Sequence, residues 1–524
     1  MTVAKSSSKH PSTAGTSGAG TSEAAPGTPT GTPTGRPTPS SSGHGTSARV
    51  TESPLADTDG AIRTLLILGA SGDLTGRLLL PGVARLIAAG RASGISLVGA
   101  GSDDWTAGQW TDRVSTTFAE AAPAAKSGGK AALAATQKGT SYHTLDVTAP
   151  GELAKLLATL RAPIAVYFAL PPAVSQRACE VLTAAELPPG TRLVMEKPFG
   201  SGEASARALN HTLAGLVPED HIHRVDHFLG KSTVFNILGL RFANRLLEPL
   251  WNSSHIAKVE IVFDEALTLE NRARYYDRAG ALRDMIQSHL LQVMAIMAME
   301  APATLHERDV RDGIAAVLRA SSISDDFTAS TRRARYTTGN LGARKVPDYV
   351  AEDGVDPANN TETLAEVEVR IQNWRWAGVP FILRSGKSLG KAQKEVVITY
   401  RPVPHLPTGF KGVDRPTRLH LGLGPDVLKL DLDVNGPGDL FTLDRVFLET
   451  DLASDELLPY GEVLDGVLNG DPLLSVRGDT AEQCWRIVEP TLKAWRENKV
   501  PLQDYPAGSS GPADWETSKS SGKR

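Results

Sequence analysis

The sequence has little cysteine and no long apolar run. Its 524 residues include only two cysteines, Cys179 and Cys484, which are too few and too far apart for a disulfide framework or a thiolate metal cage. No stretch approaches the ~18 uninterrupted apolar residues of a membrane span. No apolar segment follows the N-terminal lysines, as a signal peptide would require. We therefore expect a cytoplasmic protein that does not bind membranes.

An excess of positive charge is also absent. The chain carries 55 Lys and Arg against 59 Asp and Glu, for a formal net charge of −4, and the two signs are well mixed. A protein that binds nucleic acid usually presents a basic face that displaces counterions from the phosphate backbone. The sequence therefore predicts no nucleic-acid partner.

The N-terminal segment lacks apolar and aromatic side chains. Of the first 50 residues, 40 are Ala, Gly, Ser, Thr or Pro, and the first aromatic residue is Trp105. Such a composition cannot bury enough surface to offset the entropy lost on ordering. We predict a disordered tail over residues 1–60 and a short polar tail over 517–524.

A doubly wound α/β pattern follows the tail. Residues 62–68 form a nearly continuous apolar run, typical of a central parallel strand that is buried on both faces. A glycine turn and helical periodicity over 78–87 come next. Further short apolar runs continue the alternation, at 95–98, 164–170 and 193–195. The pattern predicts a Rossmann-like dinucleotide-binding domain over 61–225.

The pattern changes after residue 226. Helical spacing covers residues 233–250 and 280–300. Alternating apolar and polar residues then predict strands at 256–263, 365–372, 395–400, 419–423 and 428–434. Alternation of this kind is typical of an antiparallel sheet with one solvated face. We therefore expect a larger α+β domain with a mainly antiparallel sheet over 226–516.

The turn after the first predicted strand is a candidate coenzyme site. Glycine permits a tight turn and the close approach of a pyrophosphate to backbone N–H groups at a helix N-terminus. The full G-x-G-x-x-G spacing is missing, so the motif alone is equally consistent with a packing turn, and the βαβ context favours the coenzyme. The residues of this turn are Gly69, Ala70, Ser71, Gly72, Asp73 and Leu74.

Two further segments carry candidate binding groups. Lys197 follows a predicted strand, where open α/β sheets bind ligands, and Pro198 restricts its backbone. Residues 224–231 place Asp226, His227 and Lys231 close together; a solvated charge run is the simpler interpretation. Lys231 and His227 could bind a phosphorylated substrate, and Asp226 could orient a histidine elsewhere.

A metal site is an alternative to these substrate-binding roles. His221, His223 and His227 lie near one another in the sequence and superficially resemble a ligand cluster. They lack the closed ligand set that a zinc site needs, so we predict no metal.

A candidate general base lies in the second predicted helix of the C-terminal half. His289 adjoins a strongly apolar helix face, where a histidine is usually part of the core. Asp284 lies five residues earlier, ~140° around an α-helix, so the two side chains would line two sides of a cleft. This arrangement makes general-base catalysis by His289 plausible.

These segments occur in an order that resembles the glucose-6-phosphate dehydrogenase family. DHFLGK and NWRWAGVPF are the most specific motifs, and the resemblance spans nearly the whole chain after about residue 60. The matching segments are GASGDL at 69–74, EKPFG at 196–200, RVDHFLGK at 224–231, RFAN at 241–244, YYD at 275–277, RDMIQSH at 283–289, TETLAEVEVRIQNWRWAGVPFILRSGK at 361–387 and YPAGSSGP at 505–512.

The resemblance implies a reaction and an assembly. His289 would remove the C1 hydroxyl proton of glucose 6-phosphate, with Asp226 paired to it, while the C1 hydride passes to NADP and 6-phosphogluconolactone forms. No metal is needed for this chemistry. The antiparallel sheet would form a homodimer or homotetramer interface. The implied substrate-binding residues are Lys197, His227, Lys231, Glu265, Asp284 and Lys387.

The sequence departs from the family pattern at the substrate phosphate. Phe228 stands where the family usually has a tyrosine, which removes a hydrogen bond worth ~1 kcal/mol. A second basic residue expected after Lys387 falls on Ala392. Lys391 and Lys394 lie nearby, and the sequence does not assign the role to either.

A departure at the coenzyme leaves its identity open. Gly101 replaces the arginine that usually binds the 2′-phosphate of NADP, and Asp103 and Asp104 follow it. Carboxylates there accept hydrogen bonds from a ribose 2′-hydroxyl and repel a 2′-phosphate. The family resemblance implies NADP, and these residues make NAD possible.

Two other functions were considered. A sugar oxidoreductase of the glucose–fructose oxidoreductase type would share the E-K-P turn but does not explain DHFLGK or NWRWAGVPF. A non-catalytic paralogue that binds sugar phosphate would account for Phe228, for Gly101 and for Leu78, which stands where the family commonly has a basic residue. It does not account for the presence of both Asp226 and His289.

Overall fold

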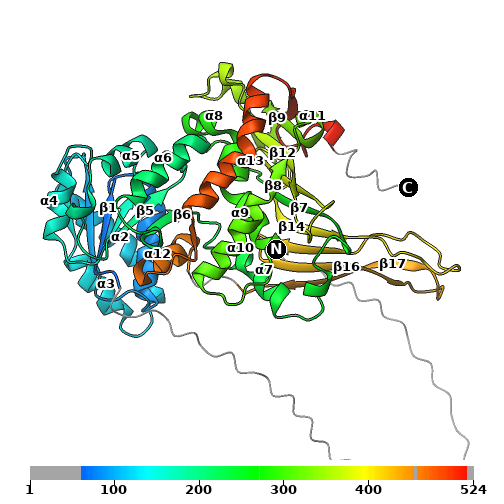
Figure 1. Ribbon diagram of the computed structural model, residues 1–524, viewed down its shortest axis with the longest axis horizontal. Helices are drawn as coiled ribbons and strands as arrows, with labels where there is room; N and C mark the ends of the chain where they lie inside the picture. The colour runs from blue at the N-terminus through cyan, green and yellow to red at the C-terminus, as the bar shows by residue number, and fades with distance from the viewer. Residues whose placement is uncertain (1–60, 271, 454–456, 516–524) are drawn as a thin grey trace, which may run out of the picture. The chain divides into compact units, whose positions relative to one another are not determined.

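The structure is a computed structural model that describes residues 61–270, 272–453 and 457–515. The tails predicted for 1–60 and 517–524 lie outside these residues. Two large sheets organise the described chain (Figure 1). Within the described part of the chain, no helix is both long and apolar enough to cross a membrane.

The first sheet is the predicted parallel sheet. Its seven strands follow the order β18-β6-β5-β4-β1-β2-β3, and all neighbours are parallel except β18 against β6. Every residue of β1 and β4 is buried, which explains their unbroken apolar sequences. The strands are β1 (Thr64–Leu68), β2 (Ser96–Gly101), β3 (Ser141–Thr144), β4 (Ile164–Phe168), β5 (Arg192–Glu196), β6 (Ile222–Val225) and β18 (Ser475–Val476).

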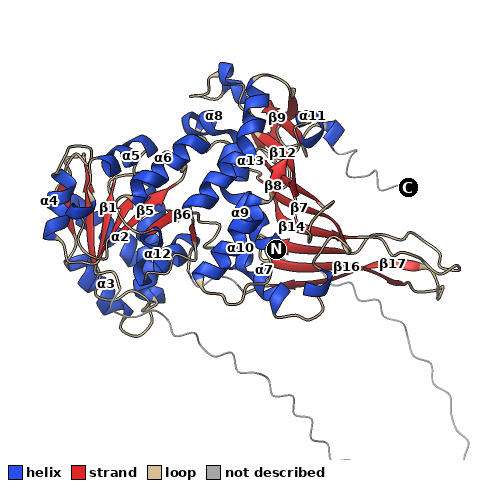
Figure 2. Cartoon of the chain, in the orientation of Figure 1, coloured by secondary structure: helices blue, strands red, loops and turns tan. Residues whose placement is uncertain are grey.

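Helices flank this sheet on both sides in the manner of a doubly wound fold (Figure 2). One of them, α12 (Pro459–Asn469), comes from the C-terminal part of the chain and packs against α1. Its apolar side chains join the core cluster that contains β1 and α1. The helices near this sheet in sequence are α1 (Leu80–Ala88), α2 (Ala107–Ala121), α3 (Gly129–Lys138), α4 (Glu152–Thr159), α5 (Pro172–Glu180) and α6 (Glu203–Ala214), with a short π-helix η2 (Thr75–Leu79) and 3-10 turns η3 (Ala122–Ala124), η4 (Ala184–Glu186) and η5 (Glu219–His221).

The second sheet has ten strands and is mainly antiparallel, as predicted. Its order is β17-β16-β15-β14-β7-β13-β12-β9-β19, with β8 paired to β12. Only β7 with β13 and β9 with β19 run parallel. The strands are β7 (Ile256–Asp264), β8 (Ser321–Ile323), β9 (Thr331–Thr337), β12 (Leu364–Ile371), β13 (Pro380–Gly386), β14 (Gln393–Tyr400), β15 (Arg418–Gly422), β16 (Val427–Asn435), β17 (Leu443–Asp451) and β19 (Leu502–Pro506).

Helices gather on one side of the second sheet (Figure 2). All eight residues of α9 (Leu291–Ala298) are buried, as expected for a helix that is apolar on every face. The others are α7 (Ser232–Phe242), α8 (Ala273–Ala281), the π-helix η7 (Leu282–Leu290), α10 (Glu307–Arg319), α11 (Phe327–Ser330) and α13 (Gly478–Arg496). Small elements complete the chain: β10 (Gly339–Leu341), β11 (Arg344–Val346), η6 (Glu248–Leu250), η8 (Tyr349–Ala351) and η9 (Pro357–Asn359).

Two predicted helices differ from those in the structure. The helix expected over 233–250 ends at Phe242, and only a 3-10 turn with Pro249 in its first positions follows. Within the helix expected over 280–300, Gly280 has φ 68°, and a π-helix follows it. Proline and left-handed glycine interrupt α-helical hydrogen bonding, which apolar spacing does not reveal.

Candidate active site

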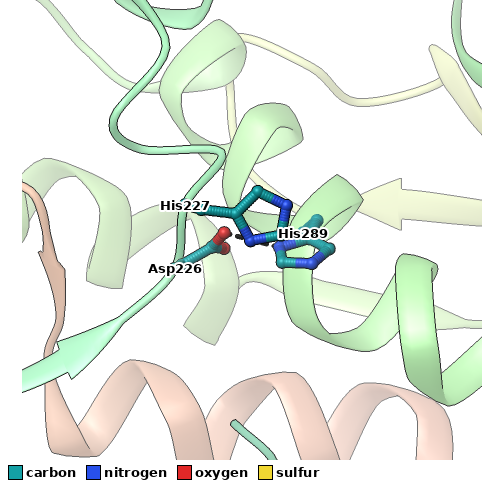
Figure 3. A group of neighbouring side chains, drawn as sticks. All are labelled: Asp226, His227 and His289. Atoms are coloured by element: carbon teal, nitrogen blue, oxygen red, sulfur yellow. Dashed lines mark hydrogen bonds and ion pairs between the residues drawn. The ribbon is translucent and has the colours of Figure 1, made fainter. Parts of the chain in front are cut away.

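The candidate base and its carboxylate lie where the first sheet meets η7. Asp226 follows β6 directly, and His289 lies in η7 (Figure 3). His289 Nδ1 lies 2.5 Å from Asp226 Oδ1, and His289 is only 1% exposed. The carboxylate holds the proton on Nδ1, which leaves the lone pair of this base on Nε2. The pair that the resemblance implied is therefore assembled.

Burial sets the protonation of this pair. Desolvation lowers the pKa of His289, although Asp226 acts in the opposite direction. Burial by itself would raise the pKa of Asp226, but the charge and hydrogen bond of His289 hold that pKa below its ordinary value. His289 is thus neutral at neutral pH, as a general base must be.

Lys197 joins the base to a second carboxylate. Its Nζ lies 2.8 Å from His289 Nε2 and donates to Asp284 Oδ1 at 3.1 Å and to the Asp284 carbonyl at 2.9 Å. Burial raises the pKa of Asp284, but the charge of Lys197 outweighs it and holds that pKa well below its usual range. Tyr275 also donates to Asp284 Oδ1, at 3.0 Å. Tyr275 belongs to the YYD segment at 275–277, but nothing in the sequence indicated that its hydroxyl would contact Asp284.

The π-helix corrects the predicted placement of Asp284 and His289. On an α-helix, residues five apart are separated by ~140°. In η7 the hydrogen bonds run from residue i to i+5, as from the Leu291 N–H to the Ile286 carbonyl, so residues five apart lie nearly one above the other. Asp284 and His289 therefore do not line opposite sides of a cleft. Both contact the same ammonium group, Lys197.

Aromatic rings surround the base. Phe228 stacks on His289 with ring centroids 4.2 Å apart, and His227 meets His289 edge-on at 4.7 Å. His227 also stacks on Tyr460 of α12 at 5.7 Å. Burial holds the pKa of His227 well below its ordinary value. His227 is therefore a neutral hydrogen-bonding group before a ligand binds.

The remaining predicted substrate residues lie near the carboxyl ends of β7 and β13, two central strands of the second sheet. Glu265 follows β7 and Lys387 follows β13, and Lys387 Nζ lies 2.7 Å from Glu265 Oε2. Lys231 precedes α7, and its Nζ lies 4.6 Å from the centroid of the Phe228 ring. The charge of Lys387 also lowers the pKa of Asp284. The structure therefore places all eight predicted catalytic and substrate residues around one site.

The glycine turn has a specific backbone arrangement. Gly69 has φ +80°, and a Cβ atom there would lie 2.3 Å from the Ala169 carbonyl oxygen, so glycine is required for both conformation and space. Arg113 of α2 donates to the Ser71 carbonyl at 2.5 Å and to the Gly72 carbonyl at 2.8 Å. The N–H groups of Gly69 and Ala70 donate to the Ala100 carbonyl, and the Gly72 N–H donates to the Gly69 carbonyl, so the backbone of the turn is tied to the end of β2 and to itself. Spacing gave no indication of Arg113, which lies about forty residues along the chain.

The end of β2 lies close to a tyrosine hydroxyl and to two carboxylates. A Cβ atom on Gly101 would lie 3.2 Å from the Tyr142 hydroxyl, which donates to the Asp103 carbonyl at 2.9 Å. Burial raises the pKa of Tyr142, and the charges of Asp103 and Asp104 add to that shift. Two carboxylates therefore act at the end of β2.

A cavity of about 750 Å³ adjoins Lys197. Its wall includes Pro198, Ser288 and Trp485, and its lining is mostly apolar. An apolar cavity with a few polar groups is typical of a site for an organic ligand.

The geometry does not favour a metal at this site. Among the described residues, ligand atoms of Asp226, His227 and His289 lie within 4.8 Å of one another. The Lys197 ammonium is 2.8 Å from His289 Nε2, so a metal cation there would meet a positive charge. The cluster of His221, His223 and His227 that the sequence suggested does not form either. His221 Nδ1 lies 3.2 Å from the Thr191 carbonyl oxygen, and His223 Nδ1 lies 3.1 Å from Ser475 Oγ.

Comparisons with known proteins cover both halves of the chain. Residues 66–236 match the NAD binding domain of glucose-6-phosphate dehydrogenase, and residues 238–523 match its C-terminal domain. The chain is 38% identical over 463 residues to glucose-6-phosphate 1-dehydrogenase of Gluconobacter oxydans, covering 85% of this chain and 94% of that protein. It is 33% identical over 474 residues to the Bacillus subtilis enzyme of the same name, covering 86% and 95%.

Solved structures agree with these matches. The crystal structure of glucose-6-phosphate 1-dehydrogenase from Mycobacterium avium superposes with a TM-score of 0.75 at 32% identity, covering 87% of this chain and 96% of that one. A glucose-6-phosphate dehydrogenase in complex with glucose 6-phosphate also gives 0.75, at 27% identity, covering 89% and 98%. The chain therefore belongs to the glucose-6-phosphate dehydrogenase family.

Proposed function

We propose that this chain is a glucose-6-phosphate 1-dehydrogenase that oxidises C1 of glucose 6-phosphate to 6-phosphogluconolactone. This reaction is the first step of the oxidative pentose phosphate pathway. The observation that carries the proposal is the buried, neutral His289, which is hydrogen-bonded to Asp226 through Nδ1 and has its lone pair on Nε2. Matches to relatives over nearly their full length support the same activity.

The base acts on the C1 hydroxyl. His289 Nε2 accepts the hydroxyl proton as the C1–H bond breaks, and a C1=O double bond forms to give the lactone. Lys197 occupies the Nε2 side in the structure, at 2.8 Å, so the substrate hydroxyl takes the place of that donor. Asp226 stabilises the imidazolium that forms. Asp284 retains Lys197 through its carboxylate and carbonyl while this exchange occurs.

The sugar hydroxyls meet charged groups with fixed positions. Glu265 and Lys387 are held together by their ion pair, and Asp284 is held by Lys197. Groups that are already oriented lose little entropy when the substrate binds. We assign these residues to the sugar, and His227 and Lys231 to its phosphate.

A nicotinamide dinucleotide fits the first sheet. When bound, its nicotinamide supplies the acceptor for the C1 hydride. The turn from Gly69 to Leu74 is the place for the pyrophosphate, because it joins the end of β1 to the start of a helical segment and Arg113 holds two of its carbonyls in position. We assign Lys197, which lies in the wall of the cavity and next to His289, to both coenzyme and substrate.

We propose that NAD serves as well as NADP. Gly101 offers no cation to a 2′-phosphate, and the charges of Asp103 and Asp104 act nearby. The family resemblance favours NADP. The rates measured with NAD and with NADP distinguish the two coenzymes.

We also propose a homo-oligomer. Phe441, Phe447 and Leu448, at or in β17, are more than half exposed at the edge of the second sheet. Large exposed apolar side chains grouped in this way are typical of interaction surfaces.

The rate of reduced-nicotinamide formation tests the function. Purified protein receives glucose 6-phosphate with NADP and, separately, with NAD at matched concentrations. We expect turnover with both coenzymes, and a preference for NAD would support the role given to Gly101. If the folded protein binds glucose 6-phosphate but reduces neither coenzyme, it is the non-catalytic paralogue.

A further inference from the structure

Two lysines from distant segments share one aromatic ring. Lys394 lies on β14 and is paired in register with Phe263 on β7, so both side chains project from the same face of the sheet. Lys394 Nζ lies 4.7 Å from the centroid of the Phe263 ring, and Lys231 Nζ lies 5.4 Å from the same centroid. The sheet and the segment before α7 thus bring two ammonium groups together.

Neither lysine is neutralised by a direct ion pair. Among the residues that the structure describes, no carboxylate lies within 4.0 Å of either Nζ. The hydrogen bond that Lys231 makes is a long one of 3.4 Å to the Leu423 carbonyl. Burial lowers the pKa of Lys231, and the charge of Lys394 lowers it further. Three carboxylates that make no direct ion pair with Lys231 act in the opposite direction and raise its pKa: Asp426, Asp226 and Glu265.

Two like charges in a partly buried site are unfavourable unless an anion joins them. Cation–π contacts with the rings of Phe228 and Phe263 stabilise the two ammonium groups weakly when no anion is bound. A phosphate dianion would remove the repulsion and give both ammonium groups acceptors. The arrangement is therefore suited to a phosphate rather than to a neutral ligand.

The lysines are close to the base. Phe228 contacts both ends of the site: its ring stacks on His289 at 4.2 Å, and Lys231 Nζ lies 4.6 Å from its centroid. One aromatic ring therefore separates the proton acceptor from the Lys231 ammonium group. A sugar phosphate can place C1 at the base and its phosphate at the lysines.

We propose that Lys394 is the second cation of the substrate-phosphate site and acts together with Lys231. The proposal rests on the proposed function, because it takes the anion to be the 6-phosphate. Lys394 thereby determines the preference for a phosphorylated sugar.

Kinetics of Lys394→Met test the proposal, with Lys391→Met as the matched control. Lys391 is three residues away on the same segment and is exposed. KM and kcat are measured with glucose 6-phosphate and with glucose, and inhibition by inorganic phosphate is measured in parallel. We expect Lys394→Met to raise KM for glucose 6-phosphate about 10- to 100-fold, as for a lost hydrogen bond to a charged group. Inorganic phosphate should inhibit this variant more weakly by a similar factor.

The controls separate charge from folding. Values for Lys391→Met should equal those of the parent, Lys394→Arg should recover most of the affinity, and kcat/KM for glucose should not change in Lys394→Met. If Lys394→Met leaves both KM for glucose 6-phosphate and phosphate inhibition unchanged, Lys394 is not in the phosphate site. Absence of turnover in the parent protein would instead contradict the proposed function.

Discussion

The two ends of the site are built in opposite ways. At the base end, His289, Asp226, Lys197 and Asp284 form a connected set of hydrogen bonds between 2.5 and 3.1 Å. At the phosphate end, Lys231 and the proposed partner Lys394 contact aromatic rings and lack direct ion pairs among the described residues. One end holds its charges in pairs before the substrate arrives, and the other does not.

This difference follows from what each end must do. A proton acceptor works only in one orientation and one protonation state, so its partners must be fixed in advance. A phosphate brings two negative charges of its own, so cations that were already paired would have to break those pairs to bind it. Variants at the base end should therefore change kcat, and variants at the phosphate end should change KM.

The largest effect is expected from His289→Asn at the base end. Asparagine retains a polar group but cannot accept the hydroxyl proton, so kcat should fall by about 10²- to 10⁴-fold. Binding of glucose 6-phosphate, measured by calorimetry, should change little because the phosphate end is intact. Unchanged turnover would show that another group is the base. Variants at the base end would then not differ from those at the phosphate end in their effect on kcat.

A smaller fall in kcat is expected from Asp226→Asn, together with a shift in the pH dependence of kcat. His289 must be neutral to act, so activity rises with pH as its proton is lost; its lowered pKa places this rise below about pH 6.5. Asp226 raises the pKa of His289, so its removal should move the rise to still lower pH. We expect kcat to fall about 10- to 1000-fold, because the imidazolium loses its counter-charge and its preferred tautomer.

The pH profile of kcat measured from pH 4.5 to 9 checks this prediction. A rise that moves to higher pH in Asp226→Asn would contradict the assigned coupling between the two residues.

The smallest effect is expected from Phe228→Tyr, which lies between the two ends. The new hydroxyl can donate to the substrate phosphate, and one such hydrogen bond is worth ~1 kcal/mol, or about fivefold in KM. The value of kcat should stay within about twofold, because the stacked ring against His289 is retained. A large fall in kcat with unchanged KM would show that Phe228 serves the base rather than the phosphate.

Much of the fold was predictable because its patterns are local. The buried run of β1 and the glycine turn after it predicted the parallel sheet, and the alternation in β7, β12 and β14 predicted the antiparallel one. Strand β13 begins with Pro380, and β17 is an exposed edge strand, so neither stood out from the sequence. The domain boundaries at residues 225 and 226 stay a prediction, and α12 shows that residues beyond 457 also join the first core.

The sequence by itself determined which residue types are present for the chemistry: a histidine, an aspartate and several lysines in motifs that resemble one family. Only the tertiary structure decided how they meet. The π-helix brought Asp284 and His289 to one lysine, and Arg113 reached the glycine turn. Sheet register placed Lys394 beside Phe263, whose ring Lys231 also approaches. Apolar periodicity depends on residues that are neighbours in the sequence, whereas charge pairing depends on distances between residues that are far apart in the sequence. Those distances exist only after the chain has folded.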